Sequence, residues 1–200
     1  MGAGFRIALR DLEIRGAGNI LGAEQSGHIQ MVGYQMYCEL LANAVKQMQG
    51  EPIEGIPTAN IDLGFAAYIT KNYIPADRIR LDVYRRIAVA KNAEELKHLE
   101  TELADVYGPP TEEVKSVLSI AGLRIAASEL DIKSIVAHGG NLVFSFAADA
   151  DKHAKRLFKS VAGRYTVADE TTAYLHLPES YFEQQTLINF IRKILRGKKQ

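Results

Sequence analysis

Hydrophobic positions in the first fifty residues predict one unit that ends in a helix. Residues 5–9 have the character of a short strand, and a glycine-rich stretch follows them. Apolar side chains then recur at three- and four-residue spacing, which is typical of an amphipathic helix, and Gly50 follows the last of them. The positions of this stripe are Tyr37, Leu40, Leu41, Ala44, Val45 and Met48. We therefore interpret residues 1–50 as the first unit.

Residues 51–59 contain two prolines and a glycine and predict a linker. Beyond it, residues 61–67 alternate between inward and outward positions and predict a strand. Three helical patterns follow, and the second begins at Asn92 with Glu95 three residues later, a capping arrangement. The predicted buried stripes contain Ile79, Val83, Ile87 and Ala88 in the first helix, Leu96, Leu99, Leu103 and Val106 in the second, and Val114, Val117, Leu118, Ala121 and Ile125 in the third.

The last third of the chain alternates between strands and helices. Residues 132–137 and 142–147 flank Gly139-Gly140, which predicts a β-hairpin. Asp149 is placed to cap a helix, and residues 173–177 predict another strand. Ser180 and Glu183 have the spacing of a capping box for a final helix. The chain is therefore predicted to be α+β: a helical hairpin, then a mixed domain over residues 60–200 with a helical half and a small antiparallel sheet.

Charge and composition exclude several classes of protein. The chain has 24 basic and 24 acidic side chains, and this balance argues against strong autonomous binding to nucleic acid. Basic residues prevail in residues 71–91 and acidic ones in residues 92–113, so neighbouring helices carry opposite charge. No apolar run is long enough to span a membrane. The single cysteine, Cys38, is interpreted as a core residue of a protein from a reducing cytoplasm.

The sequence lacks the motifs of a catalytic, cofactor or metal site. It has no phosphate-binding loop, and its glycine spacing in residues 16–22 is one residue too long for a dinucleotide fingerprint. The five histidines are scattered and have no cysteine pairs beside them, which disfavours a metal site. We expect no catalytic residue, no cofactor and no metal in this chain.

The glycine-rich stretch is the most informative part of the first unit. Gly16, Gly18 and Gly22 allow tight reversals between short helical pieces. Arg15 and Gln25 bracket the turn, and both can donate hydrogen bonds to phosphates or carbonyls. On chemistry alone, a connector in which Arg15 pairs with a nearby acid is the simpler interpretation.

Residues 5–27 resemble the TRG motif, which is shared by the superfamily-2 DNA motors RecG and the bacterial transcription-repair coupling factors. The pattern is F-x-[IL]-A-x-x-D-L-E-I-R-G-A-G-x-[IL]-L-G-x-x-Q-S-G. The resemblance implies a helical hairpin beside the second RecA-like motor lobe. It also implies that Arg15 and Gln25, with Gly16, Gly18 and Gly22, couple ATP hydrolysis to movement along the duplex. ATP and magnesium would bind in motor lobes that this chain lacks.

The second domain favours the coupling factors over RecG. Residues 73–77 and 80–88 resemble the Y/F-I-P-D…R-L-x-x-Y-K/R-R-I-A signature of their C-terminal domain, and residues 102–110 resemble E-L-x-D-R-F-G-x-x-P. Two residues depart from the pattern: Ala76 is inserted before the aspartate, and Val106 replaces the usual arginine.

The same resemblance implies an autoinhibitory role for the acidic helix. Glu102 and Asp105 lie on one helical face, joined by Glu95 and His98. In the family this domain packs on the UvrB-like N-terminal module and hides the UvrA-binding face, so Glu102 and Asp105 would pair with arginines there. A solvated acidic face is the alternative. For Arg78, Arg80, Arg85 and Arg86, DNA contact is weighed against pairing with the acidic neighbouring helix or packing along the core.

The expected function is therefore that of a C-terminal part of a bacterial, cytoplasmic DNA translocase that removes stalled RNA polymerase and recruits nucleotide-excision repair through UvrA. A stand-alone interaction module that binds a basic partner surface is the competing hypothesis. The upstream reading frame would distinguish the two.

Overall fold

The computed structural model describes residues 38, 58–159, 161 and 163–196. The chain divides into two compact units, Met1–Ile56 with Ala66–Leu118 and Pro57–Phe65 with Ser119–Gln200. The first predicted unit and nearly all of the predicted linker lie outside the described residues, so the domain boundaries stay a prediction. Cys38 is in a helix and is partly exposed.

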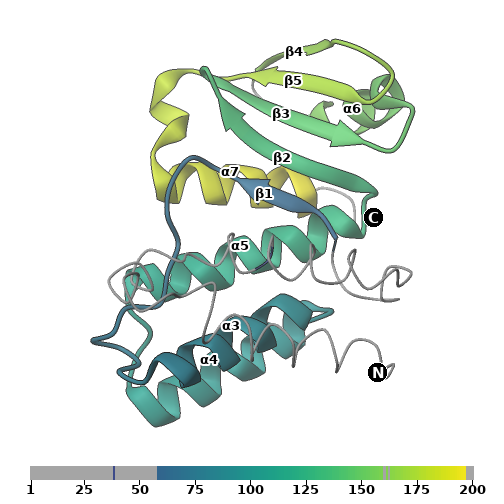
Figure 1. Cartoon of the computed structure of the whole chain (residues 1–200). Coiled ribbons are helices and arrows are strands. Elements are labelled where there is room, and N and C mark those ends of the chain that lie inside the picture. The colour runs from purple at the N-terminus through teal and green to yellow at the C-terminus, as the bar shows by residue number, and fades with distance from the viewer. Residues whose placement is uncertain (1–37, 39–57, 160, 162, 197–200) are drawn as a thin grey trace, which may run out of the picture. The chain divides into compact units, whose positions relative to one another are not determined.

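In the first compact unit, which contains residues 66–118, the described part is mainly helical. Helix α3 spans Asp77–Val89, α4 spans Ala93–Tyr107, and α5 spans Glu112–Ser128, which runs on into the second unit (Figure 1). The Asn92 side chain accepts a hydrogen bond from the Glu95 N–H at 2.9 Å, and the Glu95 carboxylate accepts one from the Lys91 N–H at 3.0 Å. These bonds satisfy two N–H groups at the start of α4, and the predicted capping arrangement is confirmed.

Two residues of the predicted apolar stripes are exposed. Ile79 is 44% exposed and Val106 is 65% exposed, so their assignment to the core was wrong. At the end of α4 the inward position passes to Tyr107, whose ring lies 5.8 Å from that of Tyr73. Because three- and four-residue steps both continue a helical stripe, the pattern alone does not distinguish position 106 from position 107. The other stripe residues are buried, namely Val83, Ile87, Ala88, Leu96, Leu99, Leu103, Val114, Val117, Leu118, Ala121 and Ile125.

The second unit is built on a five-stranded sheet of order β1-β2-β3-β5-β4 (Figure 1). The strands are β1 (Asn60–Asp62), β2 (Ile132–His138), β3 (Asn141–Phe146), β4 (Arg164–Val167) and β5 (Thr172–His176). Strand β1 pairs with β2 in parallel, and the other neighbours are antiparallel. The fold is α+β, as predicted. The predicted sheet was antiparallel, whereas the observed sheet is mixed, because β1 precedes the helices in sequence and pairs with β2 in parallel.

Local backbone geometry explains where two of these strands end. Gly139 and Gly140 have φ of 56° and 75° and form the predicted hairpin turn. The strand predicted over residues 61–67 stops at Asp62, whose carboxylate accepts a hydrogen bond from the Gly64 N–H at 3.1 Å. Gly64 itself has φ of 77°, which turns the chain out of the sheet.

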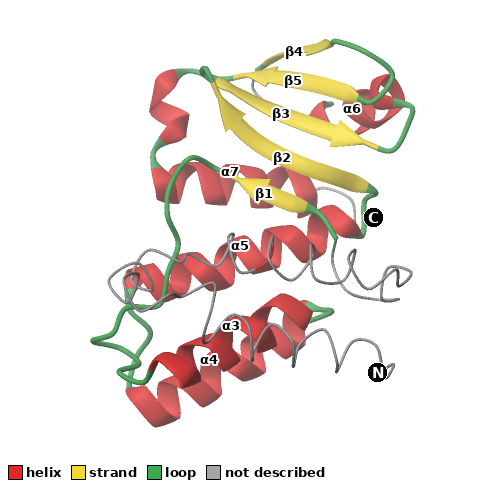
Figure 2. Ribbon diagram, in the orientation of Figure 1, coloured by secondary structure: helices red, strands yellow, loops and turns green. Residues whose placement is uncertain are grey.

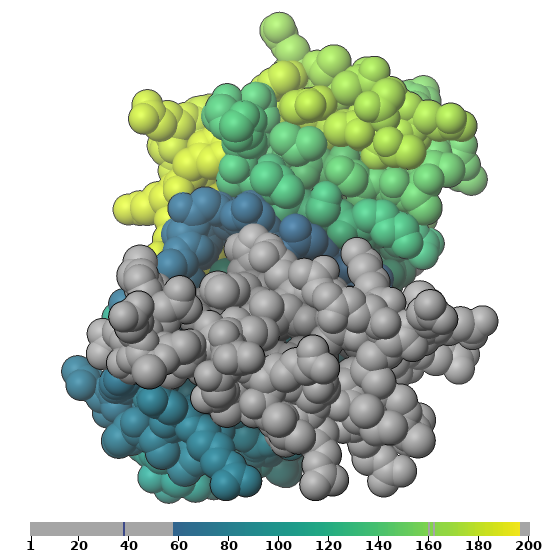
Figure 3. Space-filling model, viewed as in Figure 1, coloured from purple at the N-terminus to yellow at the C-terminus, as the bar shows by residue number. Residues whose placement is uncertain are grey.

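One face of the sheet is covered by helices α6 (Ala150–Phe158) and α7 (Gln184–Arg196), as Figure 2 shows. Helix α6 packs against β3, β4 and β5, and α7 packs against α6. Phe144 is fully buried, and its ring meets that of Phe158 edge-on at 5.0 Å. The opposite face carries half-buried Val143 and Tyr174, and Figure 3 shows atoms of these strands at the surface.

Helix α6 begins directly after Asp149, as predicted, but neither of the two predicted side-chain caps in this unit forms. Asp149 precedes α6 in a left-handed conformation, with φ of 53°, and makes no capping hydrogen bond. Residues Glu179–Phe182 form a separate 3₁₀ turn, η2, so Ser180 and Glu183 do not open α7 as a capping box. The Leu187 N–H instead bonds to the Glu183 carbonyl at 2.8 Å.

Candidate interaction surface on helix α4

The predicted interface residues all lie on α4, but they differ in exposure. Glu95, His98 and Asp105 are exposed, whereas Glu102 is partly buried. Glu95 also belongs to the capping box at the start of the helix. Its carboxylate therefore already accepts hydrogen bonds from the Lys91 N–H and from the Asn92 side-chain amide.

Glu102 forms a bidentate ion pair with Arg86 of α3. The Arg86 Nη1 donates to Glu102 Oε1 at 2.7 Å, and Nη2 donates to Oε2. This pairing lowers the pKa of Glu102, with a smaller contribution from the nearby His98, and it raises the pKa of Arg86. Two parallel hydrogen bonds fix the planes of the guanidinium and the carboxylate relative to each other. The pair therefore ties α3 to α4 within the first unit.

Asp105 and Val106 present a different surface at the end of α4. Asp105 is exposed and makes no ion pair with any residue in the described part of the chain. Val106, beside it, is 65% exposed. A carboxylate next to an uncovered valine suits a partner that offers a cation beside an apolar side chain.

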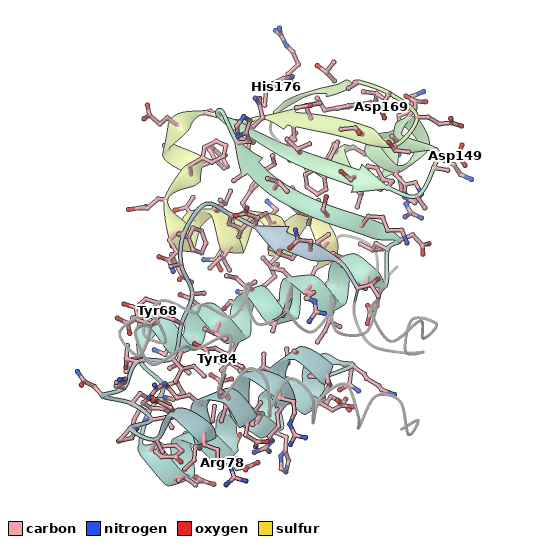
Figure 4. The ribbon with its side chains drawn as sticks, viewed as in Figure 1. Tyr68, Arg78, Tyr84, Asp149, Asp169 and His176 are labelled. Carbon is pink, nitrogen blue, oxygen red and sulfur yellow. The ribbon has the colours of Figure 1, made fainter. Side chains whose placement is uncertain are left out.

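The basic run on α3 is mostly engaged within its own unit. Arg80 is only 3% exposed and donates to the carbonyls of Ile74 at 2.7 Å and Pro75 at 3.1 Å. Arg85 pairs with Asp82 in the same helix. Arg86 thus pairs with the acidic neighbouring helix and Arg80 packs in the core, the two contacts that were weighed against DNA binding. Arg78 is exposed on α3 (Figure 4).

A tyrosine on α3 holds the preceding loop. The Tyr84 hydroxyl accepts a hydrogen bond from the N–H of Ile69 at 2.6 Å, and both residues are buried. Figure 4 shows Tyr84 on α3 beside the loop that carries Tyr68. Burial raises the pKa of Tyr84 to about 12. With Arg80, this contact holds residues 69–75 against α3.

Comparison with known proteins identifies the family. Residues 63–157 match the family described as TRCF domain. The transcription-repair-coupling factor of Myxococcus xanthus is 34% identical over 199 residues, which is 98% of this chain and 16% of that protein. Those of Escherichia coli K12 and Haemophilus influenzae are 38% and 40% identical over 74% and 76% of the chain. The chain belongs to the transcription-repair coupling factor family.

The chain spans only part of its relatives, since it covers 13% of the E. coli protein and 14% of the H. influenzae protein. A solved structure of a transcription-repair coupling factor C-terminal domain superposes with a TM-score of 0.59 at 15% identity. It covers 74% of this chain and 100% of that domain. At this identity the match supports the fold. The chain thus corresponds to a C-terminal part of a coupling factor.

The residues that the coupling-factor resemblance assigns to translocation lie outside the described residues. These are Arg15, Gly16, Gly18, Gly22 and Gln25. In the described ranges, no group of three or more histidine, cysteine or acidic side chains could hold a metal ion. No helix in the same ranges is long and apolar enough to cross a membrane.

Sequence reasoning did not identify Arg86 as the partner of Glu102. The two are sixteen residues apart and on different helices, so helical spacing within α4 places Glu102 beside His98 and Asp105 and says nothing of α3. The opposite charges of the two neighbouring helices were the available signal. They indicate that a pair will form, but they leave open which of several arginines and acids meet.

Proposed function

We propose that this chain is the C-terminal part of a bacterial, cytoplasmic ATP-dependent translocase on double-stranded DNA. The full-length protein would remove stalled RNA polymerase and recruit nucleotide-excision repair. The observation that carries this proposal is the 34% identity to a transcription-repair-coupling factor over 98% of the chain. The chain alone would hydrolyse no ATP, because the nucleotide and its magnesium belong to motor lobes outside it.

The glycine-rich part of residues 1–50 would couple the motor to DNA. Arg15 and Gln25 would pass the closure of the motor lobes to the duplex, and Gly16, Gly18 and Gly22 would act as hinges. Replacing Arg15 and Gln25 by alanine in the full-length protein should leave ATP hydrolysis in place and slow movement along DNA. Translocation at normal speed by the double variant would contradict this role.

The α4 surface would act as an autoinhibitory lid. Glu102 and Asp105 would pair with arginines on the UvrB-like module of the same protein and compete with UvrA. Exposed ion pairs are individually weak, so a closed state held by a few of them can be released when UvrA or another partner favours the open state. Reversibility of this kind is what a regulatory contact needs.

Charge reversal in the full-length protein tests the lid. Glu102→Lys with Asp105→Lys should increase UvrA binding, because the lid would be repelled from the arginines that it covers. Glu94→Lys with Glu100→Lys is the matched control, since it makes the same charge change at exposed positions of the same helix. Unchanged UvrA binding in the first variant would remove the lid from the proposed function.

A further inference from the structure

The two acids of the proposed lid are in different states in this chain. Both carboxylate oxygens of Glu102 accept hydrogen bonds from the Arg86 guanidinium, whereas Asp105 makes no ion pair in the part of the chain that the structure describes. The Glu102 and Arg86 side chains are 42% and 37% exposed. The pair is therefore formed at the surface, where a second cation can reach it.

Pairing changes what Glu102 offers to a partner. A guanidinium at hydrogen-bond distance cancels most of the field of the carboxylate, so Glu102 attracts an approaching cation far less than an unpaired acid would. The bidentate geometry also occupies the edge on which an arginine binds best. A partner can use Glu102 fully only by displacing Arg86.

We propose that Arg86 competes with the partner for Glu102, so that docking exchanges one arginine for another. This inference rests on the proposed lid and adds to it a competitor within the chain, Arg86. The incoming group would be a guanidinium, because a lysine ammonium is a point charge and cannot replace two parallel hydrogen bonds with one planar contact. The strength of the lid would then depend on the difference between two similar ion pairs, which keeps the closed state easy to open.

Neutralising Arg86 in the full-length protein tests this exchange. Arg86→Gln frees Glu102, so the lid should hold more tightly and UvrA binding should fall by about two- to fivefold, the range that one exposed ion pair supports. Arg85→Gln is the matched control. Arg85 is the adjacent residue, its side chain is also 37% exposed, and it pairs with Asp82 of its own helix. It removes the same charge without freeing Glu102, and UvrA binding should stay at the wild-type level.

A second background separates this inference from the proposed function. If Arg86 acts through Glu102, Arg86→Gln should have no effect once Glu102→Gln is present. Suppose that Glu102→Gln with Asp105→Asn raises UvrA binding but Arg86→Gln does not lower it. The lid then stands and the exchange is overturned. If the double variant leaves UvrA binding unchanged, the lid fails, and the exchange fails with it.

The pair can also be measured in the 200-residue chain without any partner. Carbon-detected NMR titration of the Glu102 carboxyl should show a lower pKa in the wild type than in Arg86→Gln, since Arg86 lowers the pKa of Glu102. Arg85→Gln should leave that titration where it is. An identical Glu102 pKa in wild type and Arg86→Gln would show that the ion pair does not form in solution and would overturn the exchange.

Discussion

The Tyr84 hydroxyl and the Ile69 N–H form a buried hydrogen bond of 2.6 Å that joins α3 to the loop before it. Tyr84 is 4% exposed and Ile69 is 4% exposed, so water does not readily replace either partner. A buried backbone N–H without an acceptor is costly. This contact therefore gives a sensitive test of the helical unit.

Tyr84→Phe should lower the free energy of unfolding by about 1–2 kcal/mol, because the Ile69 N–H loses this acceptor while the ring still fills its space. Urea unfolding of the chain measures the change. Tyr174→Phe is the control, since Tyr174 lies half-buried on the outer face of the sheet. Equal loss in the two variants would contradict a specific role for the Tyr84 hydroxyl.

The raised pKa of Tyr84 predicts a loss of stability at high pH. In the folded chain its pKa is about 12, against 10.0 for the free side chain, so the folded state holds the proton more tightly than the unfolded state. Its contribution is complete below pH 10 and is lost as the pH rises toward 12, by roughly 2 kcal/mol. Unfolding free energies of wild type and Tyr84→Phe should therefore converge between pH 10 and 12. Parallel curves would contradict the shift.

Arg80→Met should destabilise the helical unit by about 2–4 kcal/mol, although methionine fills similar space. The buried guanidinium supplies hydrogen bonds to the carbonyls of Ile74 and Pro75 and an ion pair to Asp77, and the substitution leaves these acceptors without their donor. Chemical denaturation monitored by circular dichroism measures the loss. Arg85→Met, at a more exposed position, should change stability by less than about 0.5 kcal/mol.

Gly140→Ala should cost about 1–2 kcal/mol, because Gly140 has φ of 75° in the hairpin turn. A Cβ atom there would have no neighbour within 4 Å, so the cost is backbone strain and not a clash. Gly140→Asn should cost clearly less, since asparagine tolerates the left-handed region. Thermal unfolding compares the two variants, and an equal cost for alanine and asparagine would argue against backbone strain as the cause.

Periodicity and turn residues predict most of the described fold. The three helices of residues 77–128, the Gly139-Gly140 hairpin and strand β5 follow from patterns that are strong within ten or fifteen residues. Strand β4 was missed. It has four residues, lies at an edge and is nowhere fully buried, so its alternation of polar and apolar positions is too short to distinguish from a loop.

The misassignment of Val106 and the unpredicted Glu102–Arg86 pair share a physical cause. Val106 and Tyr107 both continue the α4 stripe, and only the position of Tyr73 in another segment decides which of them turns inward. Pairing of Glu102 with Arg86 depends in the same way on how α3 lies against α4. Side-chain chemistry is readable from the sequence, whereas the partner of each side chain depends on contacts between segments that are distant along the chain.

Residues 60–62 enter the sheet as β1 beside Ile132–His138, ahead of the helices that follow them in sequence. A shortened protein that began at Ser119 would keep β2–β5 but would uncover the backbone N–H and C=O groups along the outer side of β2. An exposed strand edge of seven residues can pair with strands of other chains, so such a truncation should self-associate or precipitate. A truncation that begins before β1 should remain monodisperse. We therefore expect the three residues of β1 to limit self-association as well as to complete the sheet.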